Sequence, residues 1–265
     1  ADFLVVQDIF LNETAELADV ILPASSFAEK DGTFTNTERR VQRVRKAIDP
    51  VGDSKPDWWI ISQIAKRLGA EGFELTHPEQ IMEEISGLVP AYGGITYSRL
   101  EKTGLQWPCP TSDHPGTPIL HVDQASTKTG KCKLVPLEFK GPAEKTDADF
   151  PLLLTTDRSL YHYHGTMTRR AYGLDELEGE EKIKINPDDA ESMGFTDGEM
   201  IRVSSRRGRL EVKVQVTDIC PPGTVSMTFH FAETPTNVLT CSEIDPVAKT
   251  PATKVCAVRL ESMPS

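Results

Sequence analysis

The chain changes character near its middle, and this change constrains the fold more than any other feature. Up to residue 88, short apolar runs alternate with stretches of helical periodicity, whereas after residue 150 the pattern is mostly that of strands. Residues 3–6 and 19–23 are continuous apolar runs, typical of strands buried on both faces of a sheet. The first half is therefore predicted to be an α/β domain with a parallel sheet.

Two longer helices are predicted after these strands. Apolar residues recur at helical spacing over residues 57–69, and residues 78–88 form a second helical pattern. Asp57 stands where an N-cap belongs, and Gly69 stands where a C-terminal glycine belongs.

The helical pattern ends in a stretch rich in proline and glycine around residues 108–118. Long connections of this kind link domains or wrap a neighbour. We expect an α/β domain over residues 1–110, a connecting segment over residues 111–149 and a second domain over residues 150–265.

The second domain reads as short strands with one small helix. Period-2 alternation and glycine turns mark strands at residues 152–154, 182–185, 200–203, 210–216, 224–231 and 255–260. A helix starting at Asn186 and Pro187 and ending at Gly194 interrupts them. This pattern predicts a compact barrel of about six strands.

Charge and cysteine usage exclude several classes of function. With 29 basic and 40 acidic residues the net charge is −11, which disfavours nucleic acid or an anionic membrane as partner. No apolar run approaches the ~20 residues of a membrane-spanning helix. The 5 scattered cysteines are typical of reduced thiols in the cytoplasm. The apolar run at the very start predicts that the chain begins inside a larger polypeptide.

Two features of the first domain each have two interpretations. Residues 29–40 are either a solvated turn before a helix, which the residues alone favour, or a ligand loop at the carboxyl ends of the strands. Asp57 either caps its helix or offers its carboxylate to two N–H groups of a guanine base. From the residues alone, the cap is favoured.

The segment after residue 154 concentrates hydroxyl, guanidinium and imidazole groups. Arg158 is suited to a diphosphate, because its planar fork binds two oxygens at once. His162 and His164 have no third ligand nearby, so no metal site is predicted. Motifs of self-sufficient catalysts, such as GxSxG, HExxH, GxGxxG or a Walker loop, are absent from the sequence. The chain therefore looks like a binder, with no catalytic residue of its own.

Taken together, these segments resemble a known family. Residues 19–23 and 29–40 resemble the third domain of molybdopterin-dependent oxidoreductases, and residues 182–216 with 249–259 resemble their dinucleotide-binding domain. Residues 7–10 and 106–109 are similar to those of formate dehydrogenase catalytic subunits.

The resemblance implies a partial Rossmann-like α/β domain followed by a six-stranded double-psi β-barrel. It implies two molybdopterin guanine dinucleotides with Mo or W, and formate oxidised to CO₂, or CO₂ reduced. The [4Fe–4S] cluster and the catalytic residues belong to an N-terminal part absent from this sequence, so the chain is not expected to be active alone. The implied partners are that N-terminal half and iron–sulfur or flavin/NAD electron-transfer subunits, in the cytoplasm.

The resemblance also implies which residues contact the cofactor. They are Gln7, Ala24, Ser25, Asp57, Arg158, Ser159, His162, His164, Phe229, Asn237 and Lys254. Asp57 matches the carboxylate that reads guanine, which favours that role over the cap. Ser159, His164 and Phe229 depart from the family pattern, so backbone contacts are expected there. The alternatives are a nitrate reductase-like enzyme, a non-catalytic assembly module of a respiratory complex, or a free-standing small-molecule binder.

Overall fold

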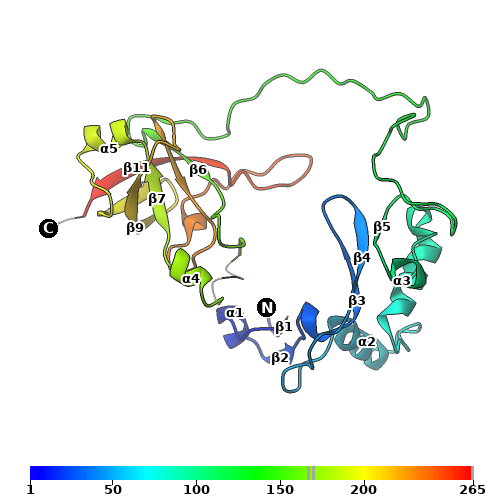
Figure 1. The fold of residues 1–265 in the computed structure, drawn as a ribbon. Coiled ribbons are helices and arrows are strands. Elements are labelled where there is room, and N and C mark those ends of the chain that lie inside the picture. Colours follow the sequence, from blue (N-terminus) through cyan, green and yellow to red (C-terminus); the bar gives the residue numbers. More distant parts are fainter. Residues whose placement is uncertain (166–167, 169–170, 264–265) are drawn as a thin grey trace. The chain divides into compact units, whose positions relative to one another are not determined.

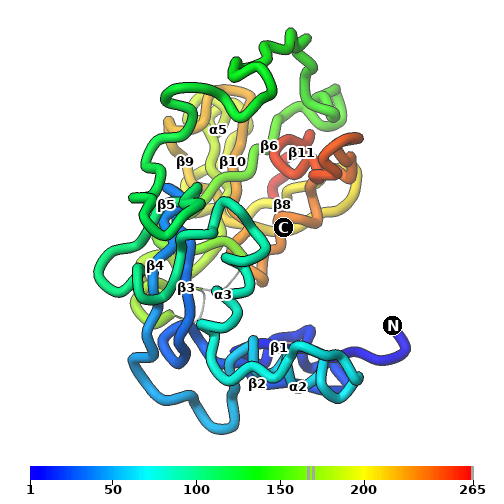
Figure 2. Tube along the Cα trace, turned by 90° about the vertical axis from the view of Figure 1, so that its right-hand side faces the viewer, coloured from blue at the N-terminus to red at the C-terminus, as the bar shows by residue number. Residues whose placement is uncertain are grey.

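The computed structural model describes residues 1–165, 168 and 171–263, and divides the chain into two compact units, Ala1–Leu134 and Val135–Ser265 (Figures 1 and 2). The division lies within the connecting segment predicted over residues 111–149. No helix or strand occurs between residues 107 and 151, which Figure 1 shows as a long green trace.

The first unit begins with a parallel sheet. Strands β1 (Val5–Asp8) and β2 (Val20–Pro23) pair in parallel, joined by helix α1 (Glu13–Glu16). The helix begins where the Asn12 side chain accepts a hydrogen bond from the Ala15 N–H at 2.9 Å. The predicted parallel pairing is confirmed, as a sheet of two strands.

A second sheet of the first unit was not predicted. Strands β3 (Gly32–Thr35), β4 (Arg40–Val44) and β5 (Leu105–Gln106) form a three-stranded antiparallel sheet. Arg39 adopts a φ of 66° in the β3–β4 turn, where its N–H donates to the Asn36 carbonyl at 2.9 Å. The prediction of a solvated turn before a helix was wrong, because β3 and β4 pair with each other and β5, far along the chain, completes the sheet.

Both longer helices are present. Helix α2 spans Asp57–Arg67 and helix α3 spans Pro78–Leu88. Gly69 ends the first helix with a left-handed φ of 79°, as its position in the sequence predicts. No helix in the described part of the chain is both long and apolar enough to cross a membrane.

The second unit is a closed barrel of six strands. They are β6 (Leu152–Thr156), β7 (Lys182–Ile185), β8 (Met200–Ser205), β9 (Arg209–Val216), β10 (Thr224–Met227) and β11 (Val255–Ser262). Their order around the barrel is β10-β6-β11-β8-β9-β7, with β6 parallel to β10 and β7 parallel to β9. The predicted six-stranded barrel is confirmed, although β10 ends four residues earlier than expected.

Alternation along the strands fills the barrel interior. Ile201 and Val203 of β8 are fully buried, as are Ile183 and Ile185 of β7. The predicted small helix is α5 (Pro187–Met193), whose cap Asn186 accepts from the Asp188 N–H at 2.9 Å. A further short helix, α4 (Leu174–Leu177), lies between β6 and β7.

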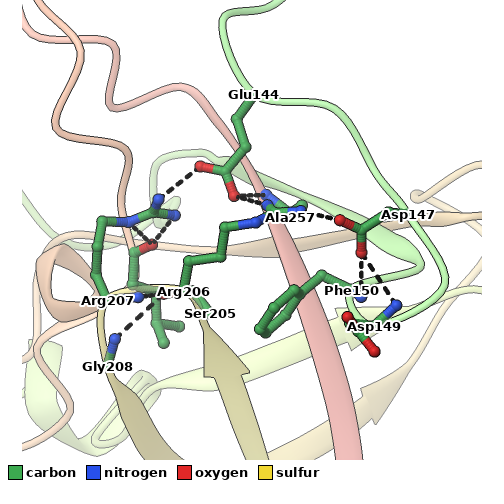
Figure 3. A network of polar contacts seen from close by, with 10 residues as sticks. Glu144, Asp147, Asp149, Phe150, Ser205, Arg206, Arg207, Gly208 and Ala257 are labelled. Atoms are coloured by element: carbon green, nitrogen blue, oxygen red, sulfur yellow. Dashed lines mark hydrogen bonds and ion pairs between the residues drawn. The ribbon is translucent and has the colours of Figure 1, made fainter.

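The segment preceding β6 is fixed to the barrel by a buried carboxylate. Glu144 binds the guanidinium groups of Arg206 and Arg207 in the β8–β9 turn, and accepts from the Ala257 N–H of β11 at 3.2 Å (Figure 3). Asp147 pairs with the same Arg206. These contacts determine where the chain enters the barrel.

Candidate cofactor-binding site

The predicted site residues of the first unit lie together at the carboxyl ends of β1 and β2. Gln7, in β1, donates from Nε2 to Asp57 Oδ1 at 2.7 Å. Ala24 follows β2 and forms a bridge with Lys55, and the Ser25 N–H donates to the Lys55 carbonyl at 2.9 Å. Because Lys55 lies two residues before α2, these contacts bring the end of β2 to the start of that helix.

Asp57 does not cap helix α2. The N-cap position is Pro56, and Asp57 is the first helical residue. Its carboxylate is held by Gln7 and by Lys30, whose Nζ also donates to the Ser25 carbonyl at 2.9 Å. Burial alone would raise the pKa of Asp57, but the hydrogen bonds from Lys30 and Gln7 outweigh it, so the pKa lies below its usual range. The side chain is 44% exposed, so an ionised carboxylate remains open to a ligand.

Polar atoms without partners lie close to this cluster. The Ser25 and Ser54 hydroxyls are buried and have no hydrogen-bond partner within the described residues. A buried unpaired hydroxyl costs free energy, so both fit a site that receives a polar ligand. A pocket of about 250 Å³ adjoins Asp57 and is also lined by Trp58 and Tyr97. The Asp57 carboxylate can accept hydrogen bonds and the rings of Trp58 and Tyr97 form apolar walls, so the pocket suits a flat base that carries N–H donors.

In the barrel, Arg158 and Ser159 lie in the loop that follows β6, after Asp157. Arg158 is exposed and makes no hydrogen bond or ion pair with another described residue. Ser159 holds its own loop together: its hydroxyl donates to the Glu178 carboxylate and accepts from the N–H groups of Tyr161 and His162 at 3.2 Å. Of these two neighbours, only Arg158 presents an unengaged side chain to a ligand.

Of the two predicted histidines, one is likewise engaged within the loop and the other lies at the surface. The His162 side chain is fully buried, and its Nε2 lies 2.5 Å from the Glu178 carbonyl oxygen. His164 is half-buried at the barrel surface. Burial lowers the pKa of His164, and the charges of Arg158 and Lys254 lower it further. His164 is therefore a neutral imidazole at pH 7, able to donate one hydrogen bond.

Phe229 and Lys254 lie near His164. The rings of Phe229 and His164 are 5.9 Å apart, and Lys254 Nζ is 6.0 Å from the Phe229 ring centre. Lys254 also donates to the Thr156 carbonyl at 2.9 Å, which ties it to the end of β6. The structure thus gathers the predicted residues Arg158, His164, Phe229 and Lys254 at one end of the barrel.

Asn237 lies on a different loop of the barrel unit. It is an exposed residue of the 3₁₀ turn η5 (Thr236–Val238), between β10 and β11. Two residues further on, the Leu239 carbonyl oxygen accepts a hydrogen bond from Arg207 Nη2 of the β8–β9 turn at 2.9 Å. The same turn binds Glu144, which precedes β6, so none of these contacts joins Asn237 to the group around Arg158.

The residues gathered at the end of β6 can bind an anion through two cations, Arg158 and Lys254, and a neutral imidazole, His164. Within the described residues, no group of three or more His, Cys, Asp or Glu could hold a metal ion. The geometry therefore supports binding and orientation of a ligand.

Two residues of these sites were not predicted. Lys30 lies in the polar segment 29–40, but a single lysine carries no spacing signal, and only the fold brings it to Asp57. His230 stacks on His162 with ring centres 4.1 Å apart. A histidine between two phenylalanines was the only available signal for it in the sequence.

Comparison with known proteins identifies both units. The molybdopterin oxidoreductase family model matches residues 1–67, and the molydopterin dinucleotide binding domain model matches residues 152–257. The chain is 51% identical over 262 residues to the F420-dependent formate dehydrogenase subunit alpha of Methanocaldococcus jannaschii, covering 98% of this chain. It is 49% identical over 264 residues to F420-dependent formate dehydrogenase 2 subunit alpha of Methanococcus maripaludis, covering 99% of this chain. The chain spans 39% of the length of each of these two relatives.

A solved structure shares the fold. Acetylene hydratase from Pelobacter acetylenicus matches with a TM-score of 0.77 and 18% identity, over 99% of this chain and 40% of its own. At this identity the likeness concerns the fold alone. Because it is 49–51% identical to these formate dehydrogenase alpha subunits over 98–99% of its length, and both models match within it, the chain belongs to the molybdopterin oxidoreductase family.

Proposed function

We propose that this chain is the cofactor-holding part of a molybdopterin-dependent formate dehydrogenase. The observation that carries the proposal is its identity of 49–51% to formate dehydrogenase alpha subunits over nearly its whole length. The expected cofactor is molybdopterin guanine dinucleotide, two copies with Mo or W. When bound, it supplies the metal centre at which formate is oxidised to CO₂ or CO₂ is reduced.

In the first unit, Asp57 would read the guanine base. An ionised carboxylate offers two acceptors to the two neighbouring N–H groups of guanine. Lys30 and Gln7 support this role, because they hold the carboxylate ionised and oriented. The unpartnered Ser25 hydroxyl and the adjacent Ala24 backbone would complete the contacts.

In the barrel, Arg158 and Lys254 would bind the cofactor's negative charges. Arg158 suits two pyrophosphate oxygens, and its exposed side chain, which no other described residue binds, supports this role. Neutral His164 would donate a single hydrogen bond, while Phe229 would supply an apolar wall and Asn237 an amide. The engaged side chains of Ser159 and His162 favour roles in shaping the loop, with any ligand contact made by backbone atoms.

The proposed partners supply what this chain lacks. The N-terminal part of the catalytic subunit would carry the catalytic residues and the [4Fe–4S] cluster, in the same or a separate chain. Iron–sulfur or flavin subunits would pass electrons on, to NAD or, as the names of the methanogen relatives suggest, to F420. We place this complex in the cytoplasm.

Purification of the native complex that contains this chain tests the proposal. We expect Mo or W, released guanosine monophosphate, and formate-dependent reduction of F420 or NAD. A complex that reduces nitrate but does not oxidise formate, or that contains neither metal, would overturn it.

Substitution of Arg158 tests the barrel site in the same complex. Arg158→Ala should weaken cofactor binding by about 1.5–3 kcal/mol, the value of a charged hydrogen bond. Arg202→Ala is the control, because Arg202 pairs with Glu211 on the barrel wall. Equal cofactor content in the wild type, Arg158→Ala and Arg202→Ala would contradict the assignment.

Substitution of Asp57 tests the guanine site. Asp57→Asn should reduce the preference for the guanine form, because an amide offers one acceptor and one donor where two acceptors are needed. The measurement is the nucleotide released from purified enzyme, as guanosine or cytidine monophosphate. Unchanged guanine selectivity would refute this role.

A further inference from the structure

The loop that follows β6 is supported from within the barrel unit by two stacked imidazoles. The rings of His162 and His230 lie 4.1 Å apart at an interplanar angle of 11°. Both residues are buried, with relative exposures of 7% and 1%. The edge of the Phe231 ring packs against each of them. The stack therefore joins the loop after β6 to the segment that follows β10.

The hydrogen bonds of the stack determine where each ring carries its proton. His162 Nε2 lies 2.5 Å from the Glu178 carbonyl oxygen, and His230 Nδ1 lies 2.6 Å from the Tyr163 carbonyl oxygen. A carbonyl oxygen only accepts, so both of these nitrogens are donors. The other ring nitrogen of His162, Nδ1, lies 3.3 Å from the Thr168 hydroxyl oxygen.

His230 is itself anchored to the barrel. Its backbone N–H donates to the Thr228 hydroxyl at 3.2 Å. That hydroxyl donates to the carboxylate of Glu181, which is only 5% exposed and directly precedes β7. The chain of bonds runs from the buried Glu181 through Thr228 and His230 to the Tyr163 carbonyl.

Tyr163 is the central residue of this support. Its carbonyl accepts from His230 and its N–H donates to the Thr168 hydroxyl at 2.7 Å. The residues that present side chains outward, Arg158 and His164, lie on either side of this fixed stretch.

We propose that His230 is a positioning residue for the cofactor. Through the Tyr163 carbonyl it holds the loop in the conformation that presents Arg158 and His164, without touching the ligand. This inference rests on the proposed function, because it assumes that the loop binds the dinucleotide. Without the N–H donor, the loop has to be ordered at the moment of binding, and affinity falls.

Two substitutions separate the donor from the ring. His230→Phe keeps an aromatic ring for the stack but removes the N–H, whereas His230→Asn keeps a donor at the Nδ1 position and removes the ring. In purified holoenzyme we expect His230→Phe to lower guanosine monophosphate content at limiting cofactor and to speed cofactor release about tenfold. His230→Asn should restore most of the loss.

A measurement on the cofactor-free chain reports the loop directly. Hydrogen exchange at the Tyr161–Tyr163 amides should become faster in His230→Phe, while the thermal midpoint of the barrel changes little. In holoenzyme that already carries Arg158→Ala, adding His230→Phe should speed cofactor release by clearly less than tenfold, because only its effect through His164 remains.

The outcomes distinguish the two proposals. If Arg158→Ala reduces cofactor content but His230→Phe does not, or if His230→Asn fails as badly as His230→Phe, the positioning role is wrong and the proposed function stands. If Arg158→Ala itself has no effect, the barrel site is wrong and the positioning role fails with it.

Discussion

Replacing Glu144 by glutamine tests how strongly the buried carboxylate stabilises the barrel. In the folded protein Glu144 Oε2 accepts from Arg207 Nη1 at 2.7 Å, and Oε1 accepts from Arg206 and the Ala257 N–H (Figure 3). Glutamine retains one of these acceptors and directs an NH₂ group at a guanidinium. Glu144→Gln therefore removes a charged hydrogen bond and places two hydrogen-bond donors, the glutamine NH₂ and a guanidinium N–H, facing each other.

The side-chain exposures determine the size of the effect. Glu144 is 9% exposed but Arg207 is 25% exposed, so water compensates part of the loss on the arginine side. A lost hydrogen bond to a charged group costs about 1.5–3 kcal/mol, and we expect about 2 kcal/mol for Glu144→Gln. For a unit of this size, that corresponds to a fall of about 6–10 °C in the unfolding midpoint.

Calorimetry of the full chain at several pH values is the assay. Burial raises the pKa of Glu144, but bonds from Arg207, the Ala257 N–H and Arg206 lower it more, so the folded pKa lies below the ordinary 4.5. The stabilisation is therefore present above about pH 4.5 and is lost as the pH falls through the folded pKa. The difference between wild type and Glu144→Gln should narrow in acid.

Glu101 provides a matched control. It also bridges two arginines, Arg43 at 2.9 Å and Arg45 at 2.8 Å, but its side chain is 54% exposed. Glu101→Gln should change the midpoint much less, because water and salt screen an exposed pair. Equal losses for Glu101→Gln and Glu144→Gln would refute the reasoning from burial.

Three further predictions follow from single residues. Burial raises the pKa of Glu181, so the free energy of unfolding should fall as the pH rises from 4.5 through the folded pKa. Urea unfolding at several pH values should show that Glu181→Gln removes this pH dependence, and an unchanged dependence would contradict the prediction. Cys132 is the exposed thiol and the other cysteines are buried, so maleimide labelling of the native protein should give a single adduct by mass spectrometry, and a second adduct would count against the fold. A Cβ at Gly208 would lie 2.3 Å from Val238 Cγ1, so Gly208→Ala should destabilise the barrel by about 1–3 kcal/mol in thermal unfolding. Gly141 has open space around it, so Gly141→Ala should leave the stability unchanged.

The elements that the sequence predicted well are those whose signals are local. Helix α3 has the bounds expected from its apolar spacing, and Gly69 ends α2 in a left-handed conformation. Strands β8 and β9 alternate with period 2 on either side of a glycine turn, so their hairpin was readable directly. In these cases the residues that specify the helix or hairpin lie within it or directly next to it in the sequence.

The β3–β4 hairpin was misread for the opposite reason, and so was the cap that the residues alone favoured for Asp57. The residues of β3 are as polar as a loop, and strand β5, which completes the sheet, lies more than sixty residues away. The cap assigned to Asp57 is correct for an isolated helix start, but Gln7 and Lys30 compete for the carboxylate in the folded chain. Neither competitor is visible from the local pattern.

The sequence by itself determined the two-part organisation, the barrel and the family, because periodicity, turn residues and motif order are properties of the chain. Only the tertiary structure decided which predicted site residues present free side chains and which support a loop. Arg158 and His162 lie four residues apart in one polar segment, yet one is exposed and the other is fully buried against His230. That difference depends on contacts with residues far away in the sequence. Such contacts form only in the folded chain, so the local sequence pattern does not show them.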